Sequence, residues 1–115
     1  MSKVATKGVL VDLLTDQSVD ETTSEGFAVP TSFTRHAFIV KTSVGVSAGV
    51  ITFETAHVPE YTGVWSPVSA SSIITVTVAD SETIVFFNGL LTAIRARIST
   101  VITGGTISAK YIGAV

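Results

Sequence analysis

The stretch IRARISTVITGGTISAKYIG, residues 94–113, decides how the rest of the chain is interpreted. Its first six residues alternate between apolar and polar side chains, and Arg95 and Arg97 are the charged members. A period of two is typical of a β-strand, in which successive side chains point to opposite faces. We therefore expect a strand with both arginines facing outward, followed by a turn at Gly104 and Gly105 into a last strand.

Three roles remain open for Arg95 and Arg97. They could be a solvated or salt-bridged pair on the surface of one subunit. They could instead lie at a subunit interface and pair with carboxylates, such as those of the acidic segment described below. Catalytic use is the third role and has the least support. Glu54 is a further candidate partner, which the sequence alone does not bring close to either arginine.

The composition predicts an all-β protein. Val, Ile and Thr supply 44 of the 115 residues, whereas Leu supplies only 5. Side chains branched at Cβ are stiff at χ1 and fit a pleated sheet better than a helix. Short strands are separated by turn residues at regular spacing, about seven or eight strands in all. We expect a single-domain antiparallel β-sandwich or a jelly-roll-like barrel.

Few charges and many apolar residues suggest either a rich sandwich core or, as we favour, a surface that is partly covered by partner subunits. Charged residues make up 14% of the chain and the net charge is −2. The share of charged residues is below the usual value of about 25%. The net charge is slightly negative, so the chain as a whole offers no basic surface for nucleic acid. The apolar runs are too short for a membrane span, and the first residues do not resemble a signal peptide. With no cysteine, disulfides and thiolate sites are excluded.

The domain organisation is expected to be simple. Residues 1–14 predict an N-terminal strand or an arm that reaches a neighbour, and residues 15–115 predict the sandwich domain. Within that domain, residues 15–26 predict an acidic surface loop, because five of the nine acidic residues lie between Asp12 and Glu25.

Three local patterns predict strand faces and turns. Residues 35–43 carry apolar side chains on both faces, which predicts a strand covered on both sides. In VITFETA, Ile51 and Phe53 share one face and Glu54 points to the other. Asn88-Gly89 follows a strand and predicts a hairpin turn.

No group of residues predicts catalysis or a cofactor. The two histidines, His36 and His57, lack a motif that would mark a nucleophile beside them. Glu54, His57 and Glu60 form at best a weak metal set, since zinc sites need several His or Cys at fixed spacing. The acidic segment lacks the spacing of a calcium loop. We expect no catalytic residue, no metal and no cofactor.

Tyr61 and Trp65 admit two interpretations. Four residues apart around a glycine, they could form an aromatic platform that stacks on a sugar. Alternatively, Trp65 fills one end of the core and Tyr61 caps it, which is the commoner use of such residues.

The pattern of strands and turns resembles small β-sandwich structural proteins of tailed-bacteriophage virions. The similar features are "GVITFET", the "GVW" of FETAHVPEYTGVWSPV, and the Ile-Arg-Ala-Arg strand with its Gly-Gly turn, within residues 35–113. The resemblance implies a non-enzymatic virion part, first a capsid decoration (cement) protein that stabilises the assembled shell. The second choice is a head-fibre or tail-associated module that recognises a host carbohydrate through Tyr61 and Trp65.

The resemblance also implies partners and a location. The partners would be the major capsid protein and further copies of the chain, as a homo-oligomer and by class a trimer, with no nucleic acid and no membrane. The protein would be made in the host cytoplasm and lie on the capsid surface. The candidate interface residues are Arg95, Arg97, Val9 and Val11.

Overall fold

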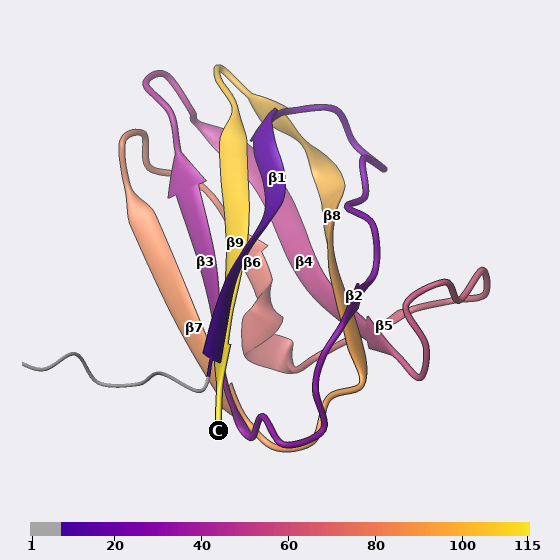
Figure 1. The fold of residues 1–115 in the computed structure, drawn as a ribbon. Coiled ribbons are helices and arrows are strands. Elements are labelled where there is room, and N and C mark those ends of the chain that lie inside the picture. The colour runs from indigo at the N-terminus through magenta and orange to yellow at the C-terminus, as the bar shows by residue number, and fades with distance from the viewer. Residues whose placement is uncertain (1–7) are drawn as a thin grey trace, which may run out of the picture.

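Two antiparallel sheets pack face to face in the computed structural model, which describes residues 8–115 (Figure 1). No α-helix occurs in this range, and no helix there is long and apolar enough to cross a membrane. The elements are β1 (Gly8–Gln17), β2 (Phe27–Ala28), β3 (Arg35–Thr42), β4 (Ala48–Ala56), β5 (Ser66–Pro67), the 3₁₀ helix η1 (Ala70–Ser72), β6 (Ile73–Thr75), β7 (Glu82–Asn88), β8 (Ala93–Thr103) and β9 (Ile107–Ala114).

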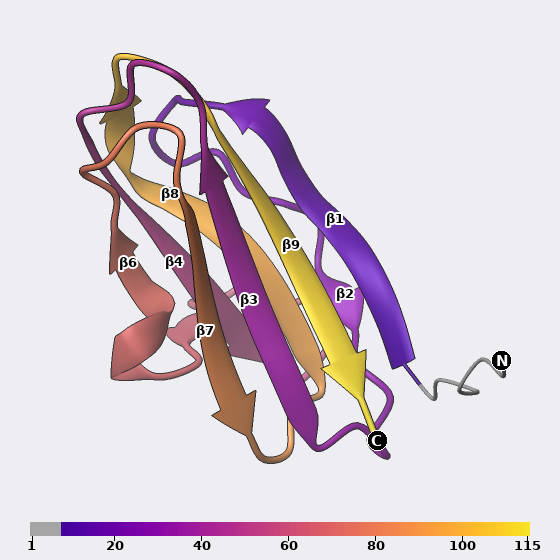
Figure 2. The ribbon, with the colours of Figure 1, turned by 90° about the vertical axis from the view of Figure 1, so that its left-hand side faces the viewer.

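The strand order is that of a jelly roll. Sheet A has the order β1-β9-β3-β7, and Figure 2 shows it face on. Sheet B has the order β2-β8-β4-β5, and β6 also pairs with β4. Most connections cross from one sheet to the other, as in two interleaved Greek keys. The predicted fold class, an all-β antiparallel β-sandwich or jelly-roll-like barrel, is confirmed, and the two packed sheets make it a sandwich.

The core lies between the sheets and follows the alternation read from the sequence. Sheet A contributes Phe38, Val40, Ile107, Ala109 and Tyr111, and sheet B contributes Ile51, Phe53, Ile94, Ala96 and Ile98, all of them fully buried. The rings of Phe38 and Phe53 meet across the core with centroids 4.8 Å apart. The faces predicted for residues 50–56 and 94–99 are therefore correct.

The turn at Asn88-Gly89 does not form the predicted hairpin. β7 pairs with β3 in sheet A, whereas β8 pairs with β4 in sheet B. Only Gly89 has a positive φ, of 148°, and Asn88 ends β7. The Asn-Gly signal therefore marks a change of direction, but the turn carries the chain between the sheets.

The predicted turn at Gly104 is present and packs against the turn that joins β3 to β4. Gly104 has a φ of 90°, in the region that favours glycine. A Cβ placed on it would lie 2.1 Å from the carbonyl oxygen of Gly45. The two turns can approach this closely only because both residues lack a side chain.

The acidic segment begins in sheet A and then lies along sheet B. Its first three residues, 15–17, belong to β1. Further on, the amide of Glu21 donates to the carbonyl of Ile98 (2.7 Å), and the amide of Ser24 donates to that of Ala96 (2.9 Å). The segment therefore borders β8 through its backbone, while its carboxylates remain exposed.

Candidate functional site

Arg95 and Arg97 converge on Glu54 on the outer face of sheet B. Glu54 lies opposite Arg95 in the β4–β8 ladder, and Arg97 lies one diagonal away. Arg95 Nε lies 2.8 Å from Oε1 of Glu54, and Arg97 Nε lies 2.9 Å from Oε2. Glu54 is only 2% exposed. A buried carboxylate needs such partners, because an uncompensated charge in this position is very costly.

Two further contacts tie this cluster to neighbouring segments. Arg97 Nη1 lies 3.2 Å from a carboxylate oxygen of Glu21 in the acidic segment. The Arg95 guanidinium lies over the Trp65 ring, 4.6 Å from its centroid, a cation–π arrangement. The arginines face outward as predicted, and they join β8 to β4, the acidic segment and the loop before β5. Their use at a subunit interface stays a prediction.

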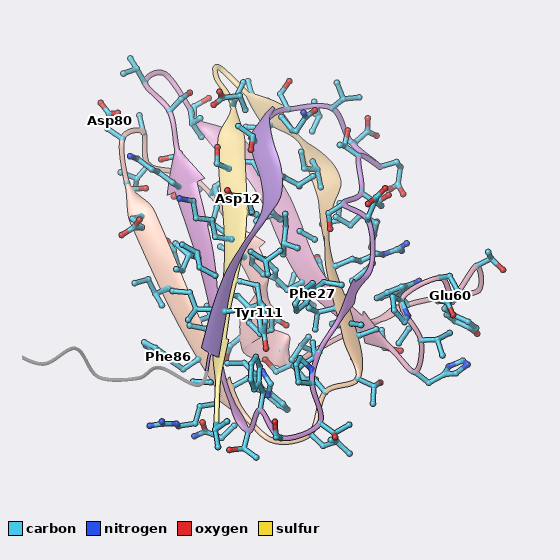
Figure 3. All side chains as sticks on the ribbon, viewed as in Figure 1. Asp12, Phe27, Glu60, Asp80, Phe86 and Tyr111 are labelled. Atoms are coloured by element: carbon cyan, nitrogen blue, oxygen red, sulfur yellow. The ribbon has the colours of Figure 1, made fainter. Side chains whose placement is uncertain are left out.

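Tyr61 and Trp65 lie in the loop between β4 and β5, which projects from the sandwich near Glu60 (Figure 3). Trp65 is 5% exposed, and its Nε1 donates to the carbonyl of Tyr61 at 2.9 Å. Arg95 covers one face of its ring. Tyr61 is exposed and its ring lies 4.8 Å from that of His57. Within this pair, Tyr61 offers the exposed aromatic ring.

The other candidate residues lie apart from this cluster. Val9 is exposed on β1, whereas the neighbouring Val11 packs against the core. Of the weak metal set, Glu54 itself belongs to the arginine cluster. Within residues 8–115, no three acidic or histidine side chains gather closely enough to hold a metal ion.

The outer face of sheet A carries an exposed apolar surface whose residues are not among the predicted site residues. The ladders place Leu10, Ile112, Ala37 and Phe86 in one row across all four strands. Leu10 is 62% exposed and Phe86 is 74% exposed. Ile39 and Ile84 follow in the next row. In the sequence, this face is indicated by the apolar residues on both faces of residues 35–43. That pattern identifies only β3, because the neighbouring strands can be named only once the strand pairing is known.

A shallow hollow of about 490 Å³ lies at one end of this face, lined by Arg35, His36, Ala37, Phe86, Asn88, Ile112 and Ala114. Figure 3 shows Phe86 at the margin of the sandwich, on β7. Large apolar side chains exposed together commonly mark an interaction surface.

Behind this hollow, His36 and Tyr111 form a buried polar pair. His36 Nε2 donates to the Gly89 carbonyl (2.8 Å), so that in the neutral ring Nδ1 accepts a hydrogen bond from the Tyr111 hydroxyl (2.6 Å). Burial raises the pKa of Tyr111 from 10.0 to about 12.

This shift predicts alkaline instability. Between pH 10 and about 12 the folded protein keeps a phenol proton that the unfolded chain loses, so stability present below pH 10 falls as pH rises. At about 1.4 kcal/mol per pKa unit, the loss is roughly 2–3 kcal/mol. Tyr111→Phe is expected to be less stable at pH 7 and to lack this extra loss, as measured by urea unfolding at pH 7 to 12. Parallel declines in both proteins would contradict the prediction.

Comparisons with known proteins find solved structures of similar fold but no match by sequence. No family model and no curated protein matches the chain. The SPBc2 prophage-derived protein YomS superposes with a TM-score of 0.68 at 15% identity, over 100% of this chain and 99% of that one. A protein from Bacillus endospore appendages, described as disulfide-linked pili, superposes with a TM-score of 0.50 at 16% identity, over 100% and 96%. At these identities the likeness shows a shared fold.

Proposed function

We propose that this chain is a non-enzymatic structural protein of a bacteriophage virion, and specifically a decoration protein on the capsid surface. The observation that carries the proposal is the likeness to a prophage-derived protein along the whole of both chains. The phage-like pattern of residues 35–113 points in the same direction. Neither observation depends on the other, since one is a pattern of residues and the other a superposition of backbones.

The surface of the molecule supports an assembly role. A protein that binds only the assembled shell stabilises the shell by mass action, and it needs a rigid face that partners can cover. The outer face of sheet A supplies exposed apolar side chains on regular strands. Arg95, Arg97 and Val9 add partly exposed or exposed positions on other faces. In this proposal the major capsid protein and further copies of the chain cover these surfaces.

The two buried titratable groups, His36 and Glu54, support a non-enzymatic role. Both ring nitrogens of His36 are engaged inside the protein. The carboxylate of Glu54 is bound by two guanidinium groups and is shielded from solvent. Neither group is free to take a proton from a substrate.

A reconstitution experiment tests the decoration role. Purified protein is mixed with virion shells that lack it, and light scattering with sedimentation measures how much protein the shells take up. We expect uptake at a fixed ratio to the major capsid protein and greater resistance of the shells to heat. Shells that already carry their full complement are the control and should take up none. Protein that ignores the depleted shells would contradict the proposal.

The projecting β4–β5 loop favours a second candidate, a host-recognition module that binds carbohydrate. Tyr61 is exposed in this loop, and Val64 is 88% exposed. A glycan-binding assay tests this function with Tyr61→Ser, and Thr62→Ser in the same loop is the matched control. Loss of binding in Tyr61→Ser alone would support the second candidate, and no glycan binding by the unmodified protein would eliminate it.

A further inference from the structure

The two edge strands of sheet A differ in how they are protected against pairing with another chain. The ladder between β1 and β9 shifts register at two places, between Asp12 and Leu14 and between Leu14 and Gln17. Such irregularities are a common way to prevent edge-to-edge association. The ladder between β7 and β3 runs without a shift from Glu82 to Asn88.

The sequence of β7, ETIVFFN, also lacks the usual protective residues. It contains no lysine, arginine or proline. Ile84 and Phe86 are exposed on the outer face, and Val85 and Phe87 are half-buried on the inner face. Within residues 8–115, no strand pairs with the free side of β7. A regular, apolar and open edge of this kind is suited to strand addition.

We propose that β7 pairs with β7 of a second copy of this chain, antiparallel about a twofold axis at Val85. The pairing joins the two four-stranded sheets into one continuous sheet. It holds whether or not the protein decorates a capsid, because it depends only on this edge.

The residues of β7 are complementary to themselves in this register, as a twofold interface requires. With Val85 on the axis, Ile84 lies opposite the partner subunit's Phe86, and the same contact occurs a second time. Both side chains are on the outer face, so each pair is an aromatic residue beside a β-branched one, a favourable cross-strand combination.

Charge fits the same register. Glu82 lies opposite the partner subunit's Asn88, and Arg35 is the neighbour of Asn88 in the β3–β7 ladder. The Arg35 guanidinium itself donates to the Val115 carbonyl, and no like charges lie opposite each other in this register. The apolar row that ends at Phe86 also continues into the partner subunit's Ile84 and Ile39. These two fits favour a second copy over an unrelated strand.

Light scattering of the purified protein over a range of concentrations tests the pairing. We expect a dimer for the unmodified chain and at least about a tenfold weaker dimer for Phe86→Lys, which places a charge beside the partner's apolar side chain. Leu10→Lys is the matched control, because Leu10 has similar exposure in the same row at the opposite edge. It should dimerise normally. Circular dichroism and thermal unfolding establish that both variants fold.

Several results would overturn the proposal. A monomer at every concentration would exclude it. Equal weakening by both lysine variants would indicate that two copies stack through the sheet faces, because edge pairing does not cover Leu10.

Oxidative crosslinking tests the register, since the chain has no cysteine of its own. Val85→Cys is expected to form a crosslinked dimer, because the two copies of residue 85 face each other across the axis. Thr83→Cys is the control and should crosslink poorly, since its two copies lie several residues apart along the strands. Crosslinking through residue 83 instead of residue 85 would overturn the register.

Discussion

Replacing Glu54 with glutamine is expected to lower the free energy of unfolding by about 3 kcal/mol, the lower end of the range for breaking a buried ion pair. The change removes the negative charge that compensates Arg95 and Arg97, which lie 2.8 and 2.9 Å from it. The lower end applies because both arginine side chains keep some contact with water. Urea unfolding at pH 7, followed by circular dichroism, measures the effect.

Glu21→Gln is the matched control for this prediction. Glu21 also pairs with Arg97, at 3.2 Å, but its side chain is largely exposed. An exposed pair contributes about 0–1 kcal/mol, so this variant should remain close to the unmodified protein. Equal losses for the two variants would show that burial of Glu54 does not set the strength of the cluster.

Replacing Phe38 with alanine is expected to cost about 3–5 kcal/mol, as for other large rings removed from a core. Phe38 is fully buried, and its ring meets that of Phe53 across the two sheets at 4.8 Å. The loss combines apolar burial with a cavity that the paired strands cannot easily close. Thermal and urea unfolding measure it. Val64→Ala, in the exposed loop, is the control and should change stability by less than about 0.5 kcal/mol.

A double-mutant cycle with Phe53→Ala tests the contact itself. Because the two rings touch, the double variant is expected to lose less than the sum of the single losses, with a coupling of about 0.5–1.5 kcal/mol. Strictly additive losses would mean that each ring stabilises its own sheet independently.

The fold class and the faces of the strands could be predicted from the sequence, because both depend on local preference and on a period of two. Ile94, Ala96 and Ile98 are buried and the arginines between them face outward, as expected. Ile51 and Phe53 likewise share the core face, opposite Glu54.

Strand pairing could not be predicted, because it is set by contacts between residues far apart in the sequence. The hairpin expected at Asn88-Gly89 is wrong for this reason. The local turn preference is met by Gly89, yet the strands on either side of the turn belong to different sheets. The residues of a turn do not determine which sheet the next strand joins.

The candidate site, too, could be predicted only in part, because strand pairing decides which of its residues meet. Composition suggested that partners cover part of the surface, but the row from Leu10 to Phe86 draws one residue from each of four strands. Glu54 was a candidate partner of the arginines, and only the β4–β8 ladder places it between them. The burial of Trp65 likewise depends on Arg95, thirty residues further along the chain.

The position of β9 has a consequence for how the protein is made. This strand is the last of the strands in residues 8–115, yet it lies between β1 and β3 in the middle of sheet A. On the ribosome, sheet A cannot close before residues 107–114 are made, since within residues 8–115 β9 is the only strand of that sheet that pairs with β1. Sheet A therefore closes only after residues 107–114 have been made, and until then its unpaired strands are exposed to aggregation.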